Sequence, residues 1–156
     1  MEASLFLRFC HAEGLNPFVN DAYLIKYDAR SHASIVVGVG TYLKRASRHK
    51  DFLGYSSGIV VEADNKIIER PGSMEHPRDT LIGGWATVRM RGRADFHHTA
   101  SLKEYNKGQA QWKERPATMI EKVAYAQALK RCIPEIDLFQ NAEDALYGVK
   151  LVPGHT

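Results

Sequence analysis

We predict an α+β fold in which an antiparallel sheet of hairpins packs against one long helix in the C-terminal half of the chain. Apolar and polar residues alternate with a period of two through the middle of the chain, which indicates strands. The stretch Pro116–Ile133 is instead apolar nearly all round when plotted as a helix, which is typical of a buried helix. A length of 156 residues with 44% hydrophobic content suits one domain, residues 1–156, with an acidic tail piece from about residue 135.

The first third of the chain predicts a helix, a hairpin and a second helix. Ser4–Glu13 carries apolar residues at helical spacing, and Gly14 follows in the position of a C-cap. Ala22–Tyr27 alternates and Ser34–Val39 is rich in β-branched residues, so we expect two paired strands. Gly40–His49 then predicts a short helix.

Two further hairpins are predicted in the middle of the chain. Phe52–Ala63 and Lys66–Arg70 flank Asp64–Asn65, a turn signal, and should pair. Leu81–Arg91 alternates between an apolar face and a polar one, and Asp95–Leu102 returns after a glycine.

The long helix is bounded by prolines. Pro116 suits a first helical turn, because its missing N–H would have no intrahelical partner there, and Pro134 ends the run. Lys122 lies on the otherwise apolar wheel and has no acidic residue one turn away. It either extends out of the core or reaches an anion. Beyond Pro134 we expect a short acidic tail piece, Asp137–Gly148, that includes a helix at Ala142–Tyr147.

Charge is unevenly distributed along the chain. Residues 78–131 hold eleven Lys/Arg and five Asp/Glu, a balance of +6, and the rest hold ten and thirteen, a balance of −3, which together give the net +3. A basic second half is expected if one surface meets phosphates, although a solvated basic surface gives the same count. Cys10 and Cys132 form no CxxC, no apolar run approaches about 20 residues, and a reducing cytosol fits.

Motifs for bond-making chemistry are absent from the sequence. There is no GxxxxGK[ST] loop for ATP, and the pair Gly38 and Gly40 lacks the third glycine of a dinucleotide loop, since position 43 is Leu43. His97 and His98 would point to opposite faces of a strand, and no HExxH or CxxC occurs, so we expect no metal and no cofactor. A metal-dependent nuclease stays open through three scattered carboxylates: Glu62, Asp64 and Asp79.

Cations interleaved with aromatic residues precede the long helix, and this pattern is typical of a track for a nucleic-acid strand. Trp112 either stacks on a base or anchors the loop in the core. The arginines on the polar face of Leu81–Arg91 either contact phosphates or are simply solvated. The candidate DNA-binding residues are Lys103, Tyr105, Lys107, Trp112, Lys113, Arg115 and Lys122, then Lys44, Arg45 and Arg48, and behind them Arg89 and Arg91.

Four segments together resemble the phage RecT family of single-strand annealing recombinases. They are FLRFCHAEGLNPFVNDAYLIKYD, IVVGVGTYLKRASRH, LIGGWATV and SLKEYNKGQAQWKERPATMIEKVAYAQALKRCIP, in the order of the family and over roughly Leu5–Tyr147. The resemblance implies single-stranded DNA binding and annealing of complementary strands, without ATP and without bond-making chemistry. It also implies an annealed duplex intermediate, a homo-oligomeric ring or filament, a phage exonuclease and a host single-strand-binding protein as partners, and the cytoplasm of a bacterial host.

Two departures from the family pattern accompany the resemblance. Family members usually carry a segment before the first helix and a C-terminal extension, whereas this sequence starts at that helix and stops at Thr156. We therefore expect a truncated core of the annealing fold. Two alternatives stay open at this point, namely the metal-dependent nuclease and a folded remnant that acts only as a structural or interaction module.

Overall fold

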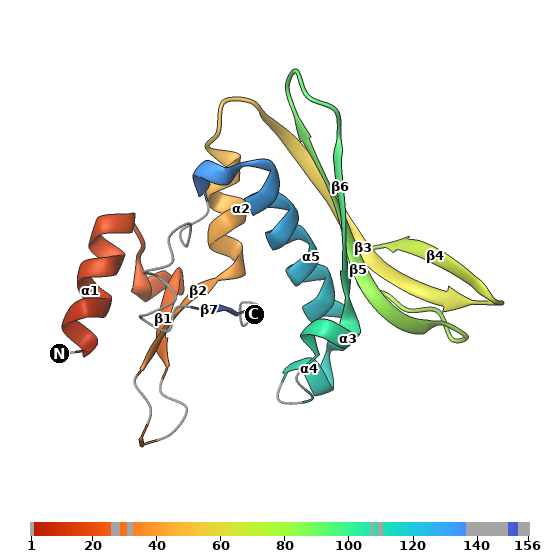
Figure 1. Cartoon of the computed structure of the whole chain (residues 1–156), viewed down its shortest axis with the longest axis horizontal. Helices are drawn as coiled ribbons and strands as arrows, with labels where there is room; N and C mark the ends of the chain where they lie inside the picture. The colour runs from red at the N-terminus through yellow and green to blue at the C-terminus, as the bar shows by residue number, and fades with distance from the viewer. Residues whose placement is uncertain are drawn as a thin grey trace.

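The computed structural model is mixed α+β, and Figure 1 shows helices between two groups of strands. The strands form a four-stranded sheet with the order β4-β3-β5-β6 and a three-stranded sheet with the order β1-β2-β7. The residues that the structure describes are 2–25, 29–30, 33–106, 108, 111–136 and 150–152.

The N-terminal elements confirm the predicted helix, hairpin and helix. Helix α1 ends before Gly14, which has the positive φ of 66° that favours glycine at a helix C-terminus. Strands β1 and β2 pair antiparallel, with Ala22 opposite Val37. In chain order the elements are α1 (Glu2–Glu13), η1 (Pro17–Val19), β1 (Ala22–Ile25), β2 (Ser34–Gly38) and α2 (Val39–Ser47).

The larger sheet is antiparallel throughout and confirms the two predicted hairpins. Asp64 and Asn65 both have positive φ, as the tight turn between the first two strands requires. Figure 1 shows this first hairpin extending away from the helices. The four strands are β3 (Phe52–Ala63), β4 (Lys66–Pro71), β5 (Thr80–Met90) and β6 (Phe96–Ser101).

Helix α5 (Pro116–Cys132) is buried on most of its surface, as its all-round apolar composition predicts. It packs against β5, β6 and β3 on one side and against α2 on the other (Figure 1). Gly84 on β5 allows the closest approach, because a Cβ there would lie 2.5 Å from the carbonyl oxygen of Ile120. Two short helices, α3 (Leu102–Tyr105) and α4 (Gln111–Glu114), pack at the start of α5.

The end of the chain differs from the prediction. After α5 the chain makes a 3-10 turn, η2 (Pro134–Ile136), and later contributes strand β7 (Lys150–Val152), which pairs parallel with β2. The strands are thus divided between two sheets, and one sheet contains a parallel pair. The short helix predicted at positions 142–147 lies outside the described residues. Among the helices of the described part of the chain, none is both long and apolar enough to span a membrane.

Candidate nucleic-acid interface

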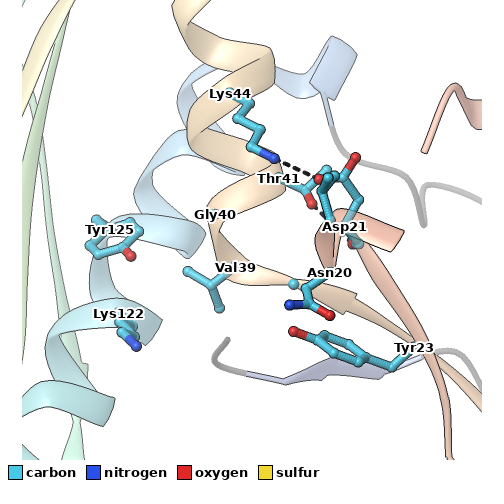
Figure 2. Close-up of a pocket in the computed structure, with 11 residues that line it drawn as sticks. Asn20, Asp21, Tyr23, Val39, Gly40, Thr41, Lys44, Lys122 and Tyr125 are labelled. Atoms are coloured by element: carbon cyan, nitrogen blue, oxygen red, sulfur yellow. Dashed lines mark hydrogen bonds and ion pairs between the residues drawn. The ribbon is translucent and has the colours of Figure 1, made fainter. Parts of the chain in front are cut away.

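A pocket of about 280 Å³ lies where the start of α2 faces α5 and the residues around β1 (Figure 2). Three segments far apart in the sequence form its walls. They are the turn into β1, the junction of β2 with α2, and the second and third turns of α5. The lining residues are Val19, Asn20, Asp21, Tyr23, Gly38, Val39, Gly40, Thr41, Lys44, Lys122 and Tyr125.

The start of α2 gives the pocket a positive end. The N-cap is Gly38, which has no side chain to accept the first-turn N–H groups, and no side-chain cap hydrogen bond is made. A Cβ at Gly38 would lie 2.8 Å from the carbonyl oxygen of Asn20, so the close approach of the two segments requires glycine. Gly40 has open space where a Cβ would be. The N-terminus of a helix carries a partial positive charge that favours anions.

Helix α5 contributes Lys122 and Tyr125 to the opposite wall. Burial lowers the pKa of Lys122, the neighbouring Arg115 lowers it further, and Glu121 acts in the opposite direction. An anion beside this ammonium group would therefore offset both the loss of water and the repulsion from Arg115. The ring of Tyr125 lies 5.4 Å from that of Tyr55 on β3, and burial raises the pKa of Tyr125 to about 12.

A second lysine reaches the pocket from α2. Lys44 Nζ lies 2.8 Å from Oδ1 of Asp21, and this ion pair is drawn in Figure 2. Burial on its own would raise the pKa of Asp21. The hydrogen bonds from Lys44 and from the N–H of Asn16 outweigh it, so the pKa of Asp21 is lowered overall. The pocket thus contains a carboxylate that stays ionised at neutral pH, together with two lysines.

The structure places three other predicted cations near the start of α5. Lys103 on α3, Lys113 on α4 and Arg115 just before α5 are all exposed, and none of them forms an ion pair with another described residue. Arg115 lies close enough to affect the pKa of Lys122, and α3 and α4 pack at the start of α5. These four cations, here called the basic region, therefore all lie toward the N-terminal end of α5. Lys107 lies outside the described residues.

The two predicted aromatic contacts are engaged within the protein. Trp112 is only 9% exposed and belongs to the hydrophobic core. Of the two roles considered for it, stacking on a base and anchoring the loop in the core, the structure shows the second. Tyr105 is half-buried, and its hydroxyl accepts a hydrogen bond from the amide of Gln127 on α5. These contacts fix α3 and α4 on α5 and thereby position Lys103 and Lys113.

The remaining predicted cations do not join this region. Arg45 on α2 donates to the backbone carbonyl of Glu13 and pairs with its carboxylate at 3.9 Å, which turns it toward α1. Arg89 lies 4.0 Å from Asp95 near the other end of α5, where the turn between β5 and β6 reaches the helix C-terminus. Two more are exposed outside the pocket lining: Arg48, at the C-terminus of α2, and Arg91, just after β5. Arg48 is still close enough to contribute to the lowered pKa of Asp21.

Sequence reasoning missed four residues of this region: Asp21, Tyr23, Tyr55 and Tyr125. The Gly38–Gly40 pair was the available signal for the pocket, because a glycine-flanked step from a strand into a helix favours an anion at the helix N-terminus. The glycine pair does not match the dinucleotide-binding pattern, and that pattern therefore predicted no site here. Tyr125 follows Lys122 by three residues and therefore lies on the same helix face.

The carboxylates considered for a nuclease are not gathered into a metal site. Within the described ranges, no group of three His, Cys, Asp or Glu side chains is placed to hold a metal ion. Asp79 instead accepts two hydrogen bonds from Arg70, at 2.6 Å and 2.9 Å, and this pair holds the loop after β4.

Fold and site together define a mixed α+β protein with a pocket that two lysines and one carboxylate line. Comparison with known families gives the closer assignment. The model of the RecT family matches residues 1–148, so the chain belongs to the RecT family. An uncharacterized protein of Ureaplasma parvum serovar 3, UU154, is 28% identical over 129 residues, which are 83% of this chain and 52% of that protein. The chain thus spans about half the length of this curated relative.

Proposed function

We propose that this protein binds single-stranded DNA and anneals complementary strands without ATP, as part of phage-type homologous recombination. The observation that carries the proposal is the convergence of Lys122, Lys44 and the N-terminus of α2 on one pocket. Exposed Lys103, Lys113 and Arg115 extend the basic surface along the start of α5. Family membership supports the same activity.

The proposed mechanism needs no bond chemistry. Annealing requires that the repulsion between two phosphate backbones be neutralised while the base edges stay free to pair. The cations at the start of α5 hold the backbone, and one phosphate enters the pocket toward Lys122. Tyr55, which is 36% exposed, and Tyr125 lie beside this position, where a base would stack for about 1–3 kcal/mol.

The proposal includes partners that family membership supports. We propose that several copies act together along one strand, as a ring or a filament, and that the annealed duplex is the product they hold. We also propose two protein partners, a phage exonuclease that supplies the single strand and a host single-strand-binding protein. The proposed location is the cytoplasm of a bacterial host.

One experiment separates the three functions that the sequence left open. Two complementary labelled oligonucleotides are mixed with the protein, with and without magnesium and without ATP, and the products are resolved on a gel. We expect faster duplex formation in both conditions and intact strands in each. Degradation that needs magnesium would instead identify a nuclease, and neither effect would identify a structural module.

The role of the pocket is tested by Lys122→Ala. We expect weaker binding of single-stranded DNA, and a plot of log affinity against log salt that is flatter by about 0.7, the amount for one lost phosphate contact. The matched control is Lys66→Ala, which removes the same charge from the exposed turn end of β4. Fluorescence polarisation measures both variants. An equal effect of the two substitutions would show that only net charge matters and that the pocket is not the site.

A further inference from the structure

We propose that Asp21 is an internal competitor of the DNA phosphate, which neutralises Lys44 in the free protein and thereby limits the affinity of the pocket for single strands. This inference rests on the proposed function, because it assigns a regulating group to the same pocket. Its basis is a negative side chain built into a wall that otherwise carries two lysines and a helix N-terminus.

Asp21 is held in place by both its backbone and its side chain. Its carbonyl oxygen accepts hydrogen bonds from the N–H of Gly38 at 2.9 Å and from the hydroxyl of Thr41 at 3.0 Å. Its own N–H donates to the carbonyl of Asn16 at 3.2 Å, and its Oδ2 accepts from the N–H of Asn16 at 2.9 Å. The backbone of Asp21 is therefore fixed at the junction between the turn and α2, and its carboxylate cannot move aside without losing the hydrogen bond from Asn16.

Lys44 is the movable member of the pair. Its side chain is 53% exposed, whereas that of Asp21 is 13% exposed. A lysine has four rotatable bonds and three donors, so its ammonium group can leave Oδ1 and reach a phosphate oxygen nearby. The fixed carboxylate and the incoming phosphate thus compete for the same cation.

Asp21 keeps its charge at neutral pH, because its pKa is lowered from the ordinary value of a carboxyl group. The hydrogen bonds from Lys44 and Asn16 stabilise the ionised carboxylate against the effect of burial. Without that charge, Lys44 would lose its ion pair with Asp21 and its ammonium group would be available to a phosphate.

The test replaces the charge and keeps the shape. In Asp21→Asn the amide oxygen still accepts the N–H of Asn16, but the group no longer neutralises Lys44. We expect affinity for an oligothymidylate to rise about tenfold, the scale of one hydrogen bond to a charged group, and the salt dependence to steepen by about 0.7. Glu13→Gln is the control, since it makes the same change in net charge opposite Arg45, a cation of α2 outside the pocket lining. We expect less than about a twofold change there.

A double-mutant cycle decides whether Lys44 carries the effect. In the wild-type background Lys44→Ala should lower affinity, because it leaves the Asp21 carboxylate in the pocket without its cation. In the Asp21→Asn background the same substitution should remove the whole gain. A Lys44→Ala variant that binds as tightly as the wild type, or more tightly, would overturn the inference, and this variant tests it even if Asp21→Asn fails to fold.

The outcomes also separate this inference from the proposed function. Absence of salt-dependent binding by the wild type would overturn both. Salt-dependent binding that Lys122→Ala weakens, combined with a folded Asp21→Asn variant that binds no tighter than Glu13→Gln, would overturn the role of Asp21 alone.

Discussion

Trp112 and Lys113 are neighbours in sequence, and they show how burial separates the roles of adjacent residues. Both belong to one run of cations and aromatic side chains, which on sequence alone is typical of a nucleic-acid track. The short helix α4 turns the indole into the core and leaves the ammonium group in solvent. Local sequence does not specify this difference, because it depends on how α4 packs on α5.

We expect Trp112→Ala to reduce the free energy of unfolding by about 3 kcal/mol, at the lower end of the range for a buried aromatic residue. Lys113→Ala should leave that free energy within about 0.5 kcal/mol, because its side chain is exposed. Urea denaturation followed by circular dichroism measures both. A Trp112→Ala variant that keeps its stability but loses DNA binding would show instead that the indole contacts DNA.

Tyr125 provides a prediction about pH. Burial raises the pKa of Tyr125 to about 12 from the ordinary value of about 10 for a tyrosine, so the folded state keeps the phenol protonated at pH values where the unfolded chain loses the proton. Its contribution to stability is therefore fully present below about pH 10 and is lost as the pH rises toward 12. Between pH 9 and pH 11 the urea midpoint should fall less in Tyr125→Phe than in the wild type. An identical fall in both proteins would contradict the assigned burial.

At the scale of elements, the sequence predicted most strands and helices to within a few residues. Alternation and turn residues marked β3 to β6, and two prolines marked α5, because these signals are local. The helices α3 and α4 were missed inside a segment described only as polar, and β7 is too short for a pattern. Strand pairing was harder still: the parallel pairing of β7 with β2 joins residues more than 100 positions apart.

Gly84 tests the packing of α5 on the larger sheet. In Gly84→Ala the added Cβ would lie 2.5 Å from the backbone oxygen of Ile120, so the helix must shift, and we expect a loss of about 1–3 kcal/mol in the free energy of unfolding. Gly40→Ala is the matched control, because nothing lies within 4 Å of the added Cβ. It should be neutral or slightly stabilising within a helix. Equal effects of both substitutions would mean that α5 does not approach β5 this closely.

At the scale of the whole molecule, the site forms where segments near residues 20, 40 and 122 meet. The sequence predicted Lys44 and Lys122 as separate candidates, and their charge and spacing were sufficient for that. It could not predict that they share a pocket with Asp21, because no local pattern reports which helix faces which turn. For the same reason the excess of positive charge in the second half of the sequence did not show how those charges are distributed in space. Arg89 and Lys103 lie toward opposite ends of the β5–β6 pair.

The last prediction concerns the sum of these charges. Lys103, Lys113, Arg115 and Lys122 form one basic region at the start of α5, and four phosphate contacts at about 0.7 each give a slope of about −2.8 for log affinity against log salt. Polarisation with a labelled oligothymidylate between about 0.05 and 0.3 M salt measures this slope. Replacing the three exposed members by alanine should leave a slope near −0.7, while replacing Arg89 and Arg91 should leave it close to that of the wild type. The slope counts the phosphates that the protein neutralises. A slope that the first set of substitutions leaves unchanged and the second set flattens would therefore place the DNA strand on the exposed face and end of β5, and not at the start of α5.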